Sequence, residues 1–88
     1  MLQVFRTNSF KKDLKRLKRQ NKNLEKLITV IGFLVNNEIL DKKYRDHILI
    51  GNYKGFRECH IEPDWLLIYR IDENSITLTR TGSHNELF

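Results

Sequence analysis

The sequence predicts an α+β fold: an N-terminal strand and a two-helix antiparallel hairpin packed on a mostly antiparallel sheet of four to five strands. Two observations predict it. Apolar residues recur at helical spacing between positions 10 and 35. From position 56 to position 81, short apolar runs are separated by turn residues, as in antiparallel strands. The predicted order is therefore β-α-α-β-β-β, with room for one further short strand.

The chain of 88 residues is long enough for one domain, which we expect to span residues 1–88. Its charged and apolar fractions, 31% and 40%, are those of a folded globular protein. No apolar run approaches the roughly 20 residues needed to cross a bilayer, and the N-terminus lacks a secretory signal pattern. The single cysteine excludes an intramolecular disulfide. These features predict a cytoplasmic protein.

Two amphipathic helices are expected after the first strand. In the first, Phe10, Leu14 and Leu17 repeat at i, i+4 and i+7, and Asn8 or Ser9 is expected to cap its N-terminus. A polar break follows. The second helix carries apolar residues at the same period, namely Leu24, Leu27, Ile28, Ile31, Leu34 and Val35.

The sequence of the second half of the chain is typical of β-strands. Residues 38–53 show no clear period, apart from a short run at 47–50 that has room to be a strand. Three strands are expected at Phe56–Glu62, Trp65–Ile71 and Ser75–Thr81. A proline and a group of Asp, Glu and Asn residues between them suit tight turns.

The charge is divided unevenly along the chain. Residues 1–43 carry a net charge of +7 and residues 44–88 a net charge of −2. A basic surface of this kind indicates a polyanionic partner, most often a nucleic acid. The alternative is a solvated, lysine-rich helix that only keeps the protein soluble.

Three histidines, His47, His60 and His84, all lie in the second half. Imidazole is the side chain best suited to exchange protons near neutral pH. Strand alternation places His60 and Glu58 on one face, where the carboxylate would hold the tautomer of the ring. Because strand ends distant in sequence can meet at one sheet edge, the histidines and Asp64 would form an acid–base site. The alternative is that each histidine is an ordinary surface residue.

Two other chemistries are conceivable for these residues, metal binding and nucleophilic catalysis by the cysteine. Imidazole and carboxylate groups suit a divalent metal ion, but no two histidines have a local ligand spacing such as His-x-x-x-His. Cys59 has no basic neighbour on its expected strand face except Arg57, so a small buried residue is favoured over a nucleophile.

Aromatic and basic residues on the strands also point to RNA. Trp65 and Tyr69 share a strand face and would stack on unpaired bases, unless they belong to the core. Arg57, Arg70 and Arg80 stand on three successive strands. On one face they would form a cationic row that holds a phosphate, whereas on different faces they would be edge charges.

Two long segments, DHILIGNYKGFRECHIEPDWLLIY and TRTGSHNELF, carry a specific resemblance. With the N-terminal strand and basic hairpin, they resemble the YafQ toxins of the RelE-like superfamily of bacterial type II toxins over essentially the whole chain. The resemblance implies a RelE-like fold and a ribosome-dependent endoribonuclease that cuts mRNA in the decoding site. In such an enzyme the 2′-hydroxyl attacks the adjacent phosphate, so no metal or other cofactor is required.

The resemblance places functional residues at five positions: His47, His60, Asp64, His84 and Phe88. Cleavage by an internal 2′-hydroxyl needs a general base, a general acid and positive charge on the phosphate. We expect His84 to be the acid and Asp64 or His60 to be the base. His47, with a neighbouring arginine, would stabilise the pentavalent phosphate, and Phe88 would stack on a codon base.

A second set of residues is expected to bind RNA. Arg57, Trp65 and Arg80 would do so on the strands. The first helix would dock on ribosomal RNA phosphates, an interaction that should weaken as salt rises. Its basic residues are Lys11, Lys12, Lys15, Arg16, Lys18 and Arg19.

The resemblance also implies partners: a DinJ-like antitoxin, with operator DNA contacted only through that antitoxin, and the ribosome with its mRNA. Two rival functions share parts of the pattern. ParE-like proteins of similar fold inhibit DNA gyrase and would not need the histidines and acids. A plain nucleic-acid-binding module would need only the basic helix.

Overall fold

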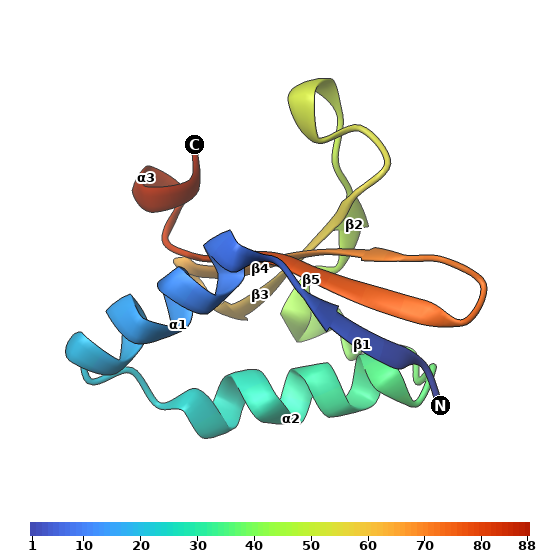
Figure 1. The fold of residues 1–88 in the computed structure, drawn as a ribbon, viewed down its shortest axis with the longest axis horizontal. Coiled ribbons are helices and arrows are strands. Elements are labelled where there is room, and N and C mark those ends of the chain that lie inside the picture. The colour runs from blue at the N-terminus through green and yellow to red at the C-terminus, as the bar shows by residue number, and fades with distance from the viewer.

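The computed structural model describes all 88 residues and confirms the α+β fold (Figure 1). A five-stranded sheet has the order β1-β5-β4-β3-β2, with β1 parallel to β5 and all other neighbours antiparallel. The strands are β1 Gln3–Arg6, β2 His47–Ile48, β3 Arg57–Glu62, β4 Trp65–Ile71 and β5 Ser75–Gly82. The helices are α1 Asn8–Arg19, α2 Leu24–Val35 and α3 His84–Leu87, with 3₁₀ turns η1 Lys42–Tyr44 and η2 Gly51–Tyr53.

The cap of α1 differs from the prediction. The Thr7 hydroxyl accepts a hydrogen bond from the Phe10 N–H at 3.0 Å, so Thr7 is the N-cap and the choice of Asn8 or Ser9 was wrong. Thr7 has the extended backbone that a cap requires, while the next two residues already belong to the helix. Asn23 caps α2 in the same way.

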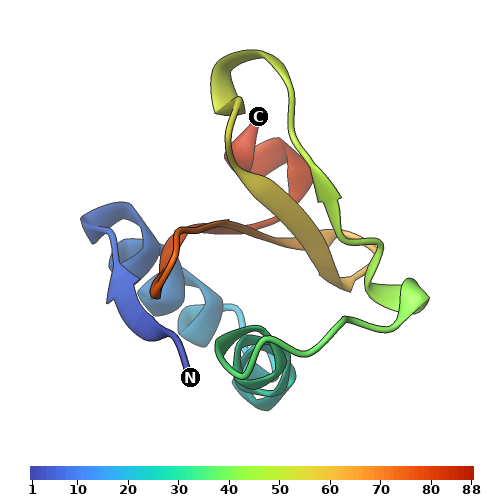
Figure 2. The same ribbon diagram turned by 90° about the vertical axis from the view of Figure 1, so that its right-hand side faces the viewer.

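Both long helices lie on one side of the sheet, which we call the helical face (Figures 1 and 2). There Phe10 and Leu17 of α1 pack with Leu27, Val30 and Leu34 of α2. From the sheet they meet a row of buried residues: Cys59, Ile61, Trp65, Leu67, Tyr69, Ile76 and Leu78. This is the main hydrophobic core.

One apolar residue of α2 lies outside this core. Ile28, which the spacing predicts on the apolar side of the helix, is 66% exposed. Val30, which was not among the predicted apolar residues, is buried. Val30 follows Leu27 by three positions and precedes Leu34 by four, so these three share the inward side of the helix.

Two further residues, Trp65 and Cys59, belong to this core, and their burial decides between their alternative roles. Trp65 is 1% exposed and donates its indole N–H to the Thr81 hydroxyl at 2.9 Å, so the prediction that it stacks on RNA bases was wrong. Cys59 is fully buried, and burial raises the pKa of its thiol to about 12. This confirms Cys59 as an inert packing residue.

The opposite side of the sheet, which we call the open face, is not covered by either long helix. Leu66, Ile68 and Leu87 form a small second core, against which Leu49, Tyr53 and Phe56 pack. Figure 2 shows the segment around η2 and the C-terminal α3 on this side, away from α1 and α2. No helix of the protein has the length and apolar character needed to span a membrane.

The single-turn helix α3 is an addition to the predicted order of elements. It is held by a capping box: the Ser83 hydroxyl accepts from the Glu86 N–H at 3.2 Å, and the Glu86 carboxylate accepts from the Ser83 N–H at 2.8 Å. Burial of Leu87 anchors the turn to the sheet. This fixes the positions of the residues on either side of Leu87.

Candidate active site

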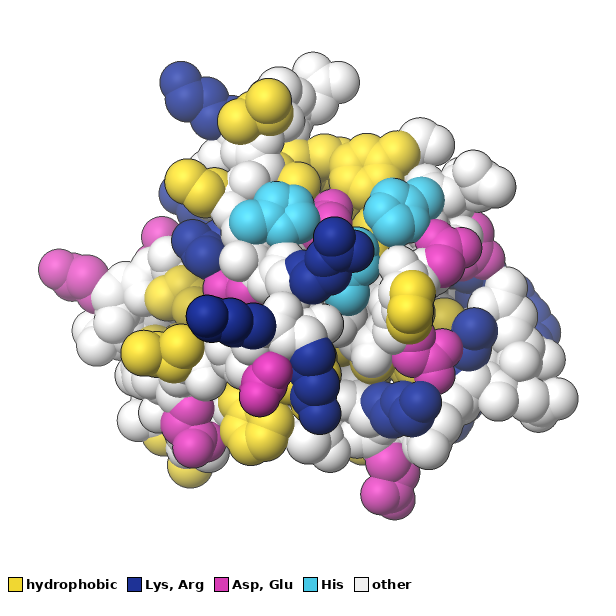
Figure 3. Space-filling model, turned by 180° about the vertical axis from the view of Figure 1, so that it is seen from behind, with side chains coloured by type: hydrophobic (Ala, Val, Ile, Leu, Met, Phe, Trp, Pro, Cys, Tyr) yellow, Lys and Arg dark blue, Asp and Glu magenta, His cyan; other side chains and the backbone are white.

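The three histidines gather on the open face, as the sequence predicted. His47 of β2 and His60 of β3 have ring centroids 6.3 Å apart, and His60 and His84 of α3 have centroids 5.8 Å apart. Figure 3 shows the three rings together around a basic side chain, with hydrophobic side chains along one edge of the group. Antiparallel pairing of β2 with β3 places His47 opposite Glu58, and His60 is the next residue on that face.

A buried carboxylate links two of the rings. Glu58 is 5% exposed, and its Oε1 lies 3.3 Å from Nε2 of His60 and 3.6 Å from Nε2 of His47. Alternation along β3 had associated Glu58 with His60, but the contact with His47 arises only from strand pairing. Glu62 does not join them, because an irregularity in the β3–β4 pairing turns it toward Lys26, 2.9 Å away.

The other nitrogen of each of these rings faces a backbone carbonyl. Nδ1 of His60 lies 3.2 Å from the Pro63 oxygen, and Nδ1 of His47 lies 2.7 Å from the Arg45 oxygen. Because a carbonyl oxygen only accepts, each Nδ1 carries a hydrogen. Nε2 of both rings is therefore the nitrogen that faces Glu58.

His84 is oriented by Asp64. One carboxylate oxygen of Asp64 accepts from the His84 ring Nδ1 at 2.6 Å and from the His84 backbone N–H at 3.0 Å. These bonds, the backbone one foremost, lower the pKa of Asp64 below its usual value. Asp64 is therefore ionised at neutral pH and a poor proton acceptor, but it is well placed to fix the ring of His84.

The C-terminal Phe88 follows α3, and its N–H donates to the His84 carbonyl at 2.9 Å. Phe88 is 62% exposed and its ring meets Tyr53 edge-to-face, with centroids 5.5 Å apart. Because the preceding residue, Leu87, is buried, the end of the chain is anchored and the Phe88 ring is held at the surface.

The predicted cationic row of arginines does not form. Arg57 is registered opposite Tyr69 on the helical face, whereas Arg80 is registered opposite Ile68 on the open face. Arg70 is exposed and lies 3.6 Å from Asp72. The structure therefore matches the second alternative, different faces, because Arg57 alone falls on the opposite phase of strand alternation.

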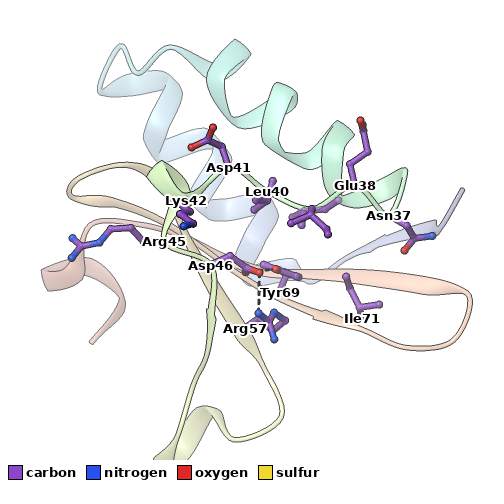
Figure 4. A pocket seen from close by; sticks show the side chains of 12 residues that line it. Asn37, Glu38, Leu40, Asp41, Lys42, Arg45, Asp46, Arg57, Tyr69 and Ile71 are labelled. Carbon is purple, nitrogen blue, oxygen red and sulfur yellow. Dashed lines mark hydrogen bonds and ion pairs between the residues drawn. The ribbon is translucent and has the colours of Figure 1, made fainter.

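Arg57 instead contributes to a pocket of about 490 Å³ between the α2 end and β4 (Figure 4). Its guanidinium donates to Asp46 at 2.9 Å, which raises the pKa of Arg57, and the Tyr69 hydroxyl donates to the same carboxylate. These contacts anchor Asp46, the residue before His47, on the helical face. Arg57 therefore lies on the face opposite the histidines, contrary to its prediction as an RNA-binding residue of the site. Its contact with Asp46 supports the start of β2.

Arg80 remains on the open face, held by a carboxylate from α1. Asp13 is 2% exposed and accepts two hydrogen bonds from Arg80, at 2.7 and 3.1 Å, and one from the Thr81 N–H at 3.1 Å. Burial alone would raise the pKa of Asp13, but the hydrogen bonds from Arg80 and its other donors outweigh it and lower that pKa. This buried acid within a basic helix was not anticipated.

One residue of the predicted basic surface also faces inward. Arg16 donates to Asp13 at 2.7 Å and to the Thr81 carbonyl at 2.8 Å, and lies 2.9 Å from Glu86 of α3. It ties α1 to β5 and α3, so its assignment to RNA docking was wrong. The remaining basic residues of α1 are exposed: Lys11, Lys12, Lys15, Lys18 and Arg19.

Part of this site has the donors of a metal centre. Glu58, His60 and His84 each present one ligand atom within 4.8 Å of the others. Two imidazoles and a carboxylate suit ions such as zinc or copper. The sequence did not reveal this set, because His84 joins it only through the fold.

The chain is similar to known toxins over nearly its whole length. A family model described as "Bacterial toxin of type II toxin-antitoxin system, YafQ" matches residues 2–88. The mRNA interferase toxin YafQ of Escherichia coli (strain K12) is 39% identical over 83 residues, covering 93% of this chain and 90% of the relative. A putative toxin YafQ of Haemophilus influenzae is 40% identical over 92 residues, covering 97% of this chain and 90% of the relative.

Solved structures give the same result. The crystal structure of YafQ from E. coli strain BL21(DE3) is 35% identical with a TM-score of 0.95, covering 100% of this chain and 99% of the other. A metal-bound toxin from Helicobacter pylori is 47% identical with a TM-score of 0.94 and full coverage of both chains. A YafQ chain in an E. coli DinJ-YafQ complex is 36% identical with a TM-score of 0.93, covering 100% and 99%.

Proposed function

Because the chain belongs to the YafQ family of bacterial type II toxins, we propose that it is an endoribonuclease that cuts mRNA in the decoding site of the ribosome. The observation that carries the proposal is the group of three imidazoles with two carboxylates on one face of the sheet. The similarity to relatives named mRNA interferases supports the choice of substrate.

In the proposed reaction the 2′-hydroxyl of one nucleotide attacks the adjacent phosphorus. His60 is the general base: its Nδ1 hydrogen is engaged by a carbonyl, and its Nε2 accepts the hydroxyl proton. Asp64 does not serve as the base in this scheme, because its lowered pKa makes it a weak base and its oxygen is already bonded to His84.

The bond between phosphorus and the 5′-oxygen then breaks. His84, oriented by Asp64, donates a proton to that leaving oxygen. The products are a 2′,3′-cyclic phosphate and a 5′-hydroxyl, and the proton taken by His60 balances the proton given by His84. The two rings lie 5.8 Å apart, close enough to act on opposite sides of one phosphate.

Negative charge grows on the phosphate during this step. His47 and Arg80, both on the open face, are the cationic groups proposed to stabilise it. Asp13 holds two nitrogens of the Arg80 guanidinium, which orients the remaining donors. Phe88 is proposed to stack on a base beside the scissile bond.

No metal ion takes part in this scheme. Occupation of Glu58, His60 and His84 by a metal would take the lone pair with which His60 accepts a proton and displace the proton that His84 donates. Cleavage on ribosomes whose own magnesium is maintained should therefore persist with a chelator selective for transition metals. Restoration of activity only by added zinc or copper would contradict metal independence.

The proposed partners are a DinJ-like antitoxin, which fits the DinJ-YafQ complexes of similar chains, and the ribosome with its mRNA. The exposed basic residues of α1 are proposed to contact ribosomal RNA phosphates. Their contribution should fall as ionic strength rises.

The decisive experiment maps mRNA 5′ ends on purified ribosomes with and without the protein, together with free mRNA as a control. We expect new 5′-hydroxyl ends within ribosome-bound codons and none on free mRNA. Intact mRNA combined with inhibited DNA gyrase in a supercoiling assay would favour a ParE-like function instead.

A further inference from the structure

Tyr53 is an aromatic residue of the open face to which none of the roles above is assigned. It is half-buried and belongs to the small second core with Phe56, and the two rings meet edge-to-face at 6.2 Å. On its other side Tyr53 meets Phe88 at 5.5 Å with the rings 77° apart. Tyr53 is therefore the central ring of three, and its position controls that of the exposed Phe88.

The loop that carries Tyr53 is shaped by two glycines. Gly51 and Gly55 have φ values of 74° and 92°, in the left-handed region that other residues rarely adopt. The loop therefore turns back so that Tyr53 points to the sheet, while Ile50 is 90% exposed on the outside. Figures 1 and 2 show this loop rising on the same side of the sheet as the C-terminus.

Tyr53 and Arg80 lie on the same face of the sheet: Arg80 is registered opposite Ile68, and Tyr53 packs against the small core that contains Ile68. Asp13 is the main cause of the raised pKa of Arg80, and Tyr53 contributes to it as well. Tyr53 thus contacts the exposed ring of Phe88 on the face that also carries the arginine proposed to bind phosphate.

We propose that Tyr53 and Phe88 form the binding site for one nucleobase of the RNA, with Tyr53 as the residue that determines base preference. The base stacks on the exposed ring of Phe88, and the Tyr53 hydroxyl hydrogen-bonds to the edge of the base. Stacking alone tolerates every base, whereas a hydroxyl at a fixed position discriminates among their donor and acceptor patterns. This inference rests on the proposed nuclease function and names the part of the substrate that the site recognises.

The test compares cleavage maps of wild type, Tyr53→Phe, Tyr53→Ala and the control Ile50→Ala on ribosomes. Tyr53→Phe keeps the ring packing, so we expect overall cleavage within about threefold of wild type but a broader base preference at one codon position. Tyr53→Ala should also raise KM roughly tenfold, because Phe88 loses its neighbour. Ile50→Ala should match wild type in both respects.

An unchanged base preference in Tyr53→Phe would overturn the proposal, whatever the rate. A second measurement needs neither ribosome nor cleavage. Trinucleotide RNAs with 2′-O-methyl groups are titrated into the protein and followed by the NMR signals of the aromatic rings. We expect shifts at Tyr53 and Phe88 that depend on base identity, and shifts independent of sequence would contradict the inference even if the protein cleaves mRNA.

Discussion

The two faces of the sheet are built from the same strands but differ in role: the helical face forms the main core, and the open face carries the candidate active site. In β4, Leu67 and Tyr69 point to the helical face and enter a core of thirteen buried residues, while Leu66 and Ile68 point to the open face and enter a core of three. Polar groups on the helical face support the fold, whereas on the open face the half-exposed His47 and His84 lie around the buried Glu58. Because two helices stabilise one face, the other can hold a buried carboxylate beside imidazoles despite the cost of its burial.

The largest effect is expected from removing the proposed acid of the open face. His84→Ala should lower the rate of cleavage on ribosomes by roughly 10²–10⁴-fold, the usual contribution of a general acid. Its side chain is 53% exposed, so the melting temperature should change little. Asn85→Ala, an exposed neighbour on the same helix, is the control. A stable His84→Ala variant that cleaves normally would remove His84 from the mechanism.

On the helical face we expect the reverse, a substitution that lowers stability and leaves cleavage nearly unchanged. Trp65→Ala should lower the free energy of unfolding by about 3–5 kcal/mol, because it leaves a cavity and removes the indole hydrogen bond to the Thr81 hydroxyl. Chemical denaturation measures this directly. Cleavage per folded molecule should stay close to wild type below the melting temperature. A stable Trp65→Ala variant with lost cleavage would mean that this buried ring contacts RNA after all.

Asp13 connects the two faces and should show its effect through pH. Asp13→Asn should lower the free energy of unfolding by about 3 kcal/mol at neutral pH, because two arginines lose a charged partner. The pKa of Asp13 lies below its usual 3.8, so its ionised form stabilises the fold fully above that value. The gap between wild type and Asp13→Asn should therefore shrink as pH falls below about 4. A gap that widens in acid would contradict this account.

A smaller effect separates two glutamates of the same strand. Glu58→Gln should reduce cleavage roughly ten- to hundredfold, because the proton that His60 takes up on Nε2 loses the negative charge 3.3 Å away. Glu62→Gln, which affects only contacts with Lys22 and Lys26, should leave the rate unchanged. Equal rates for the two variants would show that the charge of Glu58 does not assist proton uptake by His60.

Much of this arrangement was predictable from local pattern. Helical spacing located α1 and α2, alternation located β3 to β5, and the motif residues His47, His60, Asp64 and His84 do lie together. Alternation could not decide which face of β4 is covered by helices, because apolar residues occupy both of its faces. The choice between RNA stacking and core packing for Trp65 depended on that information.

The rest depended on contacts between distant residues. Asp13 and Arg80 are 67 positions apart, and nothing near Asp13 in a lysine-rich helix indicates that it is buried. Arg16 turned inward for the same reason, since its partner Glu86 belongs to a single-turn helix. That helix was missed because one turn is too short to show a period, although Ser83 and Glu86 have the spacing of a capping box.

The central claim is that His60 and His84 act as base and acid on one phosphodiester, and the pH dependence of single-turnover cleavage on ribosomes tests it most directly. The account predicts a bell-shaped profile for wild type. His60→Ala should lose the acidic limb, where the base becomes protonated, and His84→Ala should lose the alkaline limb, where the acid loses its proton. Profiles in which both limbs survive in both variants would contradict the account.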